Sequence, residues 1–270
     1  MILPIVGIVM ALATGCAILG PSPEEEPAPS AAFLAQRSEQ ALAALRRMSE
    51  FLASRPTLRF EADIQYDAVQ TSGQKIEFGS HRKYSLARPD RVRVDVAHWN
   101  GEQEMIAFDG NRLWATLSES RIYASMEYTG STPDALDLLV NDYGLASPLS
   151  DLFRRDLADE IADRVISARE LRTVTIAGVR CDHLAFRGQR VDFQLFIQQG
   201  EEPVPVRFII DYHTEAGSPQ FRARLHDWDV APAVPDSLFR FSPAAGAQRV
   251  PFPELMDLLL GPLDTEMDEQ

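Results

Sequence analysis

The chain has 270 residues, 45% of them apolar, and its 26 basic and 40 acidic residues give a formal charge of −14. The apolar content is sufficient for a full hydrophobic core in one large or two small domains, so most of the chain is not intrinsically disordered. The acidic balance argues against a nucleic-acid binder, which needs a basic face, and two cysteines are too few for a disulfide scaffold or a four-cysteine zinc site.

The N-terminal segment predicts export. Residues 2–20 form an uncharged, mostly apolar run in which the small residues 13–15 precede Cys16, a pattern typical of a secretory signal. It resembles the bacterial lipoprotein signal, in which this cysteine is acylated after cleavage. We therefore expect a signal peptide at residues 1–15, lipidation of Cys16, and a periplasmic protein anchored to the membrane as a lipoprotein. An uncleaved membrane anchor and simple secretion are the alternatives.

The residues after Cys16 extend this prediction. Enterobacterial lipoproteins that stay in the inner membrane have an aspartate after the acylated cysteine, whereas this chain has Ala17, so the resemblance allows release to the outer membrane, where we expect the anchor. The remainder of residues 16–30 is rich in proline and glutamate, which is typical of a tether between membrane and domain. If Cys16 is lipidated, Cys181 has no intramolecular partner, and we expect it to be a buried, unreactive residue in a strand.

A helix and a series of strands follow the tether. Apolar residues with helical spacing predict a helix over residues 31–54, which ends before Pro56. Residues 58–68 then alternate apolar and polar side chains, the pattern of an antiparallel strand with one buried face. Turn dipeptides and further alternation predict a meander of about six strands that reaches residue 128; the dipeptides are Ser72-Gly73, Pro89-Asp90, Asn100-Gly101 and Asp109-Gly110.

A helical insertion divides this meander from a second one. Thr132-Pro133-Asp134 is typical of a helix start, with Thr132 as the N-cap, and Ser147-Pro148 predicts a second helix toward Leu157, which residues 159–163 extend. Strands then resume to residue 230, for a total of about eleven; they are expected at residues 171–176, 181–187, 191–197, 206–212 and 221–230. We expect one domain over residues 31–252 and an acidic tail over residues 253–270, which forms either a docking helix or a frayed one.

Two blocks of sequence carry a family resemblance. The first begins at Thr132-Pro133-Asp134 and includes Asp142-Tyr143-Gly144 and Pro148-Leu149-Ser150. The second begins at Gly217 and includes Asp227-Trp228-Asp229 and a closing pattern that starts with Pro235-Asp236-Ser237-Leu238-Phe239. Over about residues 35–252 they resemble a bacterial family of predicted periplasmic proteins of unknown function. That family is similar to the lipoprotein-carrier superfamily, which includes LolA- and LolB-like proteins, LppX and the N-terminal domain of RseB.

The resemblance implies an α+β fold, a strongly curved antiparallel half-barrel whose concave face is covered by the N-terminal helix and the helical insertion. It also implies a carrier that binds acyl chains or other hydrophobic ligands between sheet and helices, with no catalytic residues. Candidate ligand-binding residues lie on the apolar face of the strands: Phe60, Ile64, Tyr66, Phe78, Tyr84, Val94, Phe193, Leu195, Phe208 and Ile210. The alternative for each is ordinary core packed under the helices.

No sequence pattern points to catalysis or to a metal. The five histidines form no HExxH motif or i, i+4 pair, and GxSxG, Walker and dinucleotide-binding glycine patterns are absent from the sequence. Acid–histidine neighbours such as His226-Asp227 are more often surface residues, so we expect no metal, no cofactor and no enzyme. The alternatives to a carrier are an envelope sensor or interaction module that binds a protein partner, and a hydrolase of unknown class.

Overall fold

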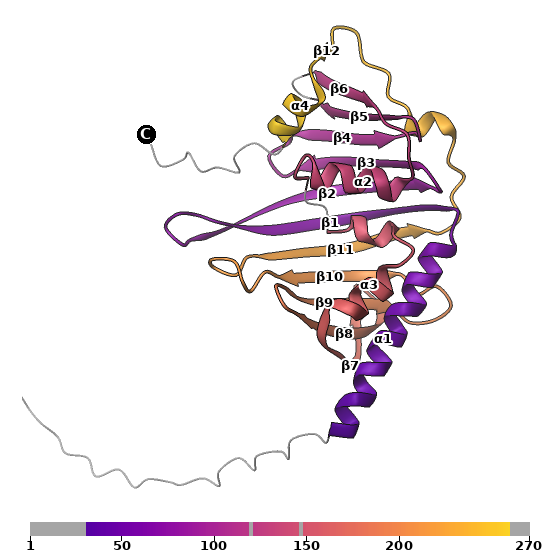
Figure 1. Ribbon diagram of the computed structural model, residues 1–270, viewed down its shortest axis with the longest axis vertical. Helices are drawn as coiled ribbons and strands as arrows, with labels where there is room; N and C mark the ends of the chain where they lie inside the picture. The colour runs from indigo at the N-terminus through magenta and orange to yellow at the C-terminus, as the bar shows by residue number, and fades with distance from the viewer. Residues whose placement is uncertain (1–30, 119–120, 146–147, 260–270) are drawn as a thin grey trace, which may run out of the picture.

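The computed structural model describes residues 31–118, 121–145 and 148–259, so the predicted signal peptide, Cys16 and the tether lie outside it. The described chain begins with helix α1 (Ala31–Ser54) and continues into a meander of six strands (Figure 1). These strands are β1 (Thr57–Val69), β2 (Lys75–Ala87), β3 (Arg91–His98), β4 (Gln103–Phe108), β5 (Arg112–Leu117) and β6 (Ile122–Glu127).

A helical insertion and a second meander follow. The insertion consists of α2 (Thr132–Asn141), the 3-10 helix η1 (Ser150–Phe153) and α3 (Leu157–Arg164). The second meander contains β7 (Val165–Ile176), β8 (Val179–Gly188), β9 (Asp192–Gln198), β10 (Pro205–Asp211) and β11 (Gln220–Asp229). The described chain ends with the 3-10 helix η2 (Asp236–Phe239), strand β12 (Gln248–Arg249) and helix α4 (Phe252–Leu259).

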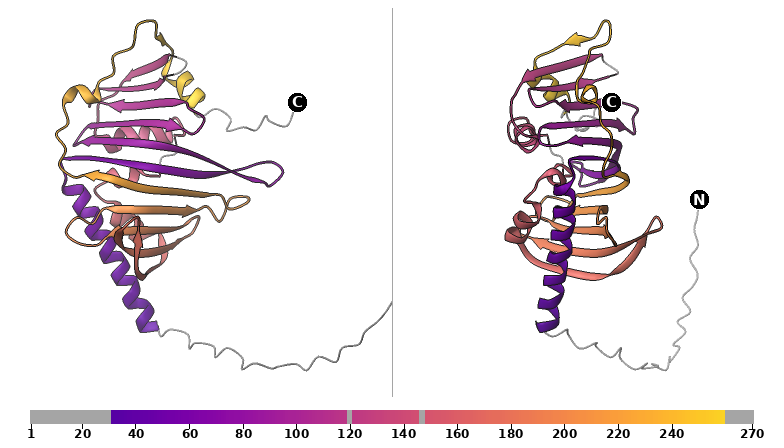
Figure 2. Two further views of the ribbon diagram at one scale, coloured as in Figure 1. Left: turned by 180° about the vertical axis from the view of Figure 1, so that it is seen from behind. Right: turned by 90° about the vertical axis from the view of Figure 1, so that its right-hand side faces the viewer.

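All these strands form one curled, open sheet in the order β12-β6-β5-β4-β3-β2-β1-β11-β10-β9-β8-β7. Antiparallel pairing of β1 with β11 joins the two meanders at the centre of the sheet. Figure 2 shows the helices of the insertion on one face of the sheet, so the predicted α+β half-barrel is confirmed. The predicted strand count of about eleven misses β12, because two residues that pair with β6 are too few to show alternation.

The alternation predicted for β1 divides its side chains between the two faces of the sheet. Leu58, Phe60, Ala62 and Ile64 are buried under the helices, whereas the odd-numbered residues between them are at least partly exposed. Gly73, Gly101 and Gly110 occupy three of the predicted turns with positive φ values of 83°, 98° and 94°, a conformation that side chains with a Cβ rarely adopt. The strand register therefore follows from local sequence.

Helix α1 contributes one apolar stripe to the core. Ala41, Leu45, Met48 and Leu52 are at most 1% exposed, and the helix packs on β7, β8 and α3. Among the described residues no helix is both long enough and apolar enough to span a membrane.

The helical insertion differs from its prediction in three details. The N-cap of α2 is Ser131 rather than Thr132, because Ser131 and Asp134 form a reciprocal capping box. The second predicted helix is divided into η1 and α3 by Arg154, whose backbone is extended. Strand β7 begins at Val165 instead of residue 171, because Val165–Glu170 pair with β8.

The segment after β11 runs from the centre of the sheet along the strand ends to the edge at β6 (Figures 1 and 2). Arg91 of β3 forms an ion pair with Asp236, and Arg93 donates a hydrogen bond to the carbonyl of Leu238, which places Phe239 in a fully buried position. Helix α4 then packs on β5 and β6. The described start of the predicted tail is therefore a docked helix.

Candidate functional site: a cavity under α1 and α3

A cavity of about 500 Å³ lies between the second meander and the helices. Four of its residues come from two neighbouring strands: Phe193 and Leu195 of β9, and Phe208 and Ile210 of β10. Phe193 pairs with Ile210 and Leu195 with Phe208 across the two strands. Because alternate residues of a strand point to the same side, this register gathers all four side chains into one apolar wall.

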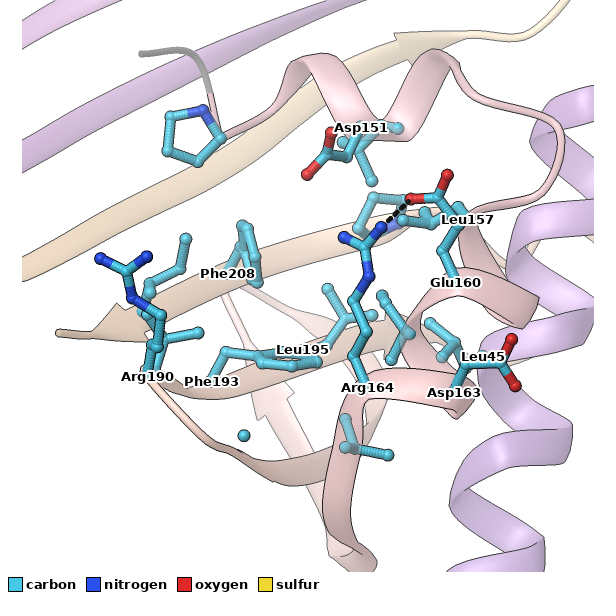
Figure 3. A pocket seen from close by; sticks show the side chains of 18 of the residues that line it. Leu45, Asp151, Leu157, Glu160, Asp163, Arg164, Arg190, Phe193, Leu195 and Phe208 are labelled. Atoms are coloured by element: carbon cyan, nitrogen blue, oxygen red, sulfur yellow. Dashed lines mark ion pairs between the residues drawn. The ribbon is translucent and has the colours of Figure 1, made fainter. Parts of the chain in front are cut away.

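The helices supply the opposite wall. Leu45 and Met48 of α1, Leu152 of η1, and Leu157 and Ile161 of α3 line the cavity, and Figure 3 shows Leu45 and Leu157 across from Phe193 and Phe208. The two walls belong to elements that are distant in sequence, so the cavity exists only after α1 and the insertion have packed on the sheet.

Arg88 fixes η1 to the end of α1. Its side chain donates hydrogen bonds to the carbonyl oxygens of Phe153 (2.7 Å) and Arg55 (3.2 Å). The carbonyl groups at a helix end have no hydrogen-bond donor within the helix. The Arg88 guanidinium supplies donors to such carbonyls at the ends of both elements. Arg88 thereby sets the distance between two parts of the helical wall.

Charged side chains surround the rim of the cavity. Arg164 forms an ion pair with Glu160 (3.6 Å), and Arg154 pairs with both Glu160 (3.1 Å) and Asp137 (2.8 Å). Arg190 lies at the end of the cavity that is farthest from α1 (Figure 3). The rim is therefore polar while the walls are apolar, which is the usual composition of a site for a hydrophobic ligand with a polar end.

Asp151 is the titratable group most affected by this environment. Its carboxyl faces the cavity (Figure 3), and burial among surrounding protein raises its pKa, an effect that Arg154 partly opposes. The side chain nevertheless remains accessible to solvent, because the space beside it is a cavity. A ligand that fills the cavity would remove that solvent.

The structure separates the ten predicted ligand-binding residues into two groups. Phe193, Leu195, Phe208 and Ile210 line the cavity, and the other six do not. Of those six, Phe60, Ile64 and Tyr84 are buried in the core, whereas Tyr66, Phe78 and Val94 are partly buried on the strands of the first meander.

The aromatic contacts explain why Phe60 belongs to the core. Its ring stacks on Tyr84 at 4.6 Å and on Trp228 at 4.3 Å between centroids, so no space remains beside it. Sequence reasoning did not identify the helical wall of the cavity. Leu45 and Met48 lie on the predicted apolar stripe of α1, and that stripe is the sequence feature from which the wall could have been predicted.

Cys181 is a free, fully buried residue of β8. Burial, with a smaller contribution from Asp182, raises the pKa of its thiol to about 11, so the reactive thiolate is scarce at neutral pH. The predicted burial of this cysteine in a strand is confirmed.

The comparisons with known proteins agree with the predicted family. Residues 41–253 match the family DUF2092, which is described as a predicted periplasmic protein. The chain belongs to this family. No curated protein matches it.

Several solved structures are similar to the chain at low sequence identity. The MucA/MucB complex of Pseudomonas aeruginosa is 16% identical, with 75% of this chain and 61% of that chain covered and a TM-score of 0.42. A LolA superfamily protein from Nitrosomonas europaea is 12% identical over 74% of this chain and 97% of its own, with a TM-score of 0.40. LprF from Mycobacterium bovis is 10% identical over 73% and 96%, with a TM-score of 0.46. The predicted resemblance to LolA-like proteins is confirmed, and the chain spans less than two thirds of the MucB chain.

Proposed function

We propose that this DUF2092 protein binds a hydrophobic ligand, the acyl chain of a lipid or lipoprotein, in the cavity under α1 and α3. The observation that carries the proposal is the cavity itself, about 500 Å³ in volume with apolar walls on both sides. Cavities of this size are typical of ligand sites rather than of packing defects.

The apolar walls supply the affinity. Burial of a methylene group contributes about 0.8 kcal/mol, so an acyl chain with about fifteen buried methylenes gains about 12 kcal/mol before the cost of ordering it. Micromolar binding needs about 8 kcal/mol. The difference leaves room for the loss of chain entropy on binding.

The role that fits this site is that of a carrier or ligand-binding protein in the cell envelope, with no catalytic step. Cys16, after residues typical of a lipoprotein signal, would carry the membrane anchor, and residues 16–30 would act as the tether. Ala17 favours the outer membrane by the enterobacterial rule. Such a protein takes up acyl chains from one membrane or partner and shields them from water.

Uptake of a fluorescent fatty acid by the full-length protein tests the proposal. We expect saturable binding by the wild type and a loss of at least about tenfold in affinity for Phe208→Glu, because a charge in an apolar wall is poorly solvated. The matched control is Ile209→Glu, which places the same charge on the same strand but on the opposite face and should change affinity by less than about twofold.

A folded wild-type protein that takes up no probe would contradict the proposal and would favour an envelope sensor or interaction module. Equal loss of binding in both variants would also contradict it, because the effect would then not come from the cavity.

A further inference from the structure

Five side chains that carry metal-ligand chemistry meet on the face of the sheet opposite the cavity. They come from its three central strands: Glu61 and Asp63 from β1, His81 from β2, and His226 and Asp227 from β11. The register sets Asp63 directly across from His81, and Glu61 directly across from His226. The hydrogen-bonded ladder thus fixes the backbone under four of these groups, and Asp227 follows His226 directly in β11.

Each of the two imidazole rings lies between two carboxylates. His81 contacts Glu61 through Nε2 (2.9 Å) and Asp63 through Nδ1 (2.9 Å). His226 contacts Asp227 through Nδ1 (2.8 Å) and turns Nε2 toward Asp63, 3.3 Å from its Oδ2. That Nε2 atom is buried and makes no hydrogen bond within the described structure. Each ring therefore has one nitrogen held by an outer carboxylate and the other nitrogen facing the carboxylate of Asp63.

A β-bulge creates the contact between His226 and Asp227. Between Arg59 and Glu61 of β1, the partner register on β11 moves from Asp229 to His226, so β11 holds one extra residue there. Asp227 has a positive φ of 52°, which aspartate tolerates better than most residues. The bulge brings two consecutive side chains within hydrogen-bond distance of one another, whereas a regular strand would point them to opposite faces.

We propose that Asp63, His81 and His226 form a zinc-binding site, with Glu61 and Asp227 as the carboxylates that position the two histidines. Zinc favours imidazole nitrogen and carboxylate oxygen at 2.0–2.2 Å, which places neighbouring ligand atoms of a tetrahedron about 3.3 Å apart. The ligand atoms of the three residues lie within 4.8 Å of one another. Ligating histidines generally donate their second nitrogen to a carboxylate, and both histidines here have that partner.

The charges around the site are compatible with a divalent cation. Glu61, Asp63 and Asp227 carry three negative charges, whereas Lys83 pairs with Glu61 at 3.0 Å and Arg224 with Asp63 at 2.7 Å. The three carboxylates and the two cations leave one net negative charge before the histidines are counted. The ligands join three strands, so a bound ion would cross-link the centre of the sheet, at a distance from the cavity and independently of its ligand.

Titration of the metal-free full-length protein with Zn²⁺, in competition with a chromogenic chelator, tests this proposal. We expect one ion per chain, and a loss of affinity of at least about tenfold for His81→Gln and for His226→Gln. Asp227→Asn should weaken binding by about tenfold, because it perturbs only the orientation of His226. The control is His183→Gln, since His183 contacts Gln194 on another part of the sheet, and it should leave the affinity unchanged.

Co²⁺ provides a second readout that does not depend on how the variants fold. Co²⁺ bound to the wild type should give the visible absorption of a tetrahedral or five-coordinate site with nitrogen ligands. Absence of stoichiometric Zn²⁺ binding by the wild type would overturn the proposal. Binding that survives His226→Gln, or that is lost equally in His183→Gln, would overturn it as well.

Discussion

Phe60 and Phe208 have similar side chains but different surroundings. Phe60 is 2% exposed between two stacked rings, whereas Phe208 borders the cavity. We expect Phe60→Ala to lower the free energy of unfolding by about 3–5 kcal/mol, as is usual for a phenylalanine removed from a packed core. Phe208→Ala should cost clearly less and should instead weaken acyl-chain binding.

Urea denaturation and a fatty-acid titration on the same samples separate the two effects. If Phe208→Ala destabilises the fold as much as Phe60→Ala and leaves binding intact, the wall of the cavity is ordinary core.

Asp151 makes ligand binding depend on pH. Burial already raises the pKa of this carboxyl, and a ligand that excludes water from the cavity would raise it further. A carboxyl group whose pKa rises when the ligand binds takes up a proton on binding. The affinity for the ligand should therefore increase as the pH falls from the pKa of the complex to the pKa of the free protein, by up to about tenfold per pH unit. Asp151→Asn should bind at least as tightly at pH 7 and should lose this dependence.

The control for this prediction is Asp163→Asn, at an exposed carboxylate of the same rim, which should keep the wild-type pH profile. An Asp151→Asn protein with an unchanged profile would show that the proton binds elsewhere.

At the scale of elements, Arg88 connects α1 to η1 through two backbone carbonyls. Arg88→Met keeps much of the side-chain volume but leaves both acceptors without this donor, so we expect a loss of about 2–3 kcal/mol in the free energy of unfolding and weaker ligand binding. Arg112→Met is the control, because among the described residues Arg112 forms an ion pair only with the exposed Glu127, and the substitution should cost less than about 0.5 kcal/mol. Similar losses in both variants would contradict the connecting role of Arg88.

The central strands should also make the fold sensitive to acid. Burial by itself would raise the pKa of Asp67, but hydrogen bonds from Arg222 and from the backbone of Gln220 hold it below its ordinary value. The pKa values of Asp63 and Glu61 are lowered too. A carboxyl whose pKa is lower in the folded than in the unfolded chain stabilises the fold above its unfolded pKa, and this contribution is lost as the pH falls through the folded value.

We therefore expect the free energy of unfolding, measured with urea, to fall from about pH 5 to about pH 2. Asp67→Ala should be less stable than the wild type by about 2 kcal/mol at pH 7 and should show a smaller decrease in acid. Glu50→Gln, at an exposed position of α1, should follow the wild-type curve. Parallel curves for Asp67→Ala and the wild type would contradict the role of this pair.

Local sequence predicts the strands of this protein better than its helical insertion. Alternation and turn dipeptides predict β1 to β5, and three of the four turns contain a glycine with positive φ. The division of the insertion at Arg154 and the early start of β7 depend on pairing with β8 and on packing against α1. Neither interaction has a signature in the residues themselves.

The same distinction applies to the two candidate sites. Alternation along β9 and β10 predicts four inward-facing side chains, those of Phe193, Leu195, Phe208 and Ile210. Alternation along β1 predicts the same orientation for Phe60 and Ile64. Only the packing of α1 and α3 decides which inward-facing residues border a space. The zinc site is less predictable still, because His81 and His226 are brought together by the pairing of β1 with both β2 and β11.

At the scale of the whole molecule, the two meanders differ in their relation to the cavity. One buried core extends through both meanders, and the cavity lies in the second, beneath α1 and α3. Strand β1 connects the halves through β11, so the proposed zinc site lies at the junction and the proposed ligand site lies to one side of it.

Native mass spectrometry of the full-length protein from its own cell envelope, followed by lipid extraction, tests the central claim most directly. A lipid covalently attached at Cys16 persists on denaturation, whereas a ligand in the cavity is released, so the two are distinguishable. We predict a releasable, acyl-containing ligand on the wild type that is absent from Phe208→Glu. A wild-type protein that carries no releasable ligand and takes up none when fatty acid is added would contradict the account.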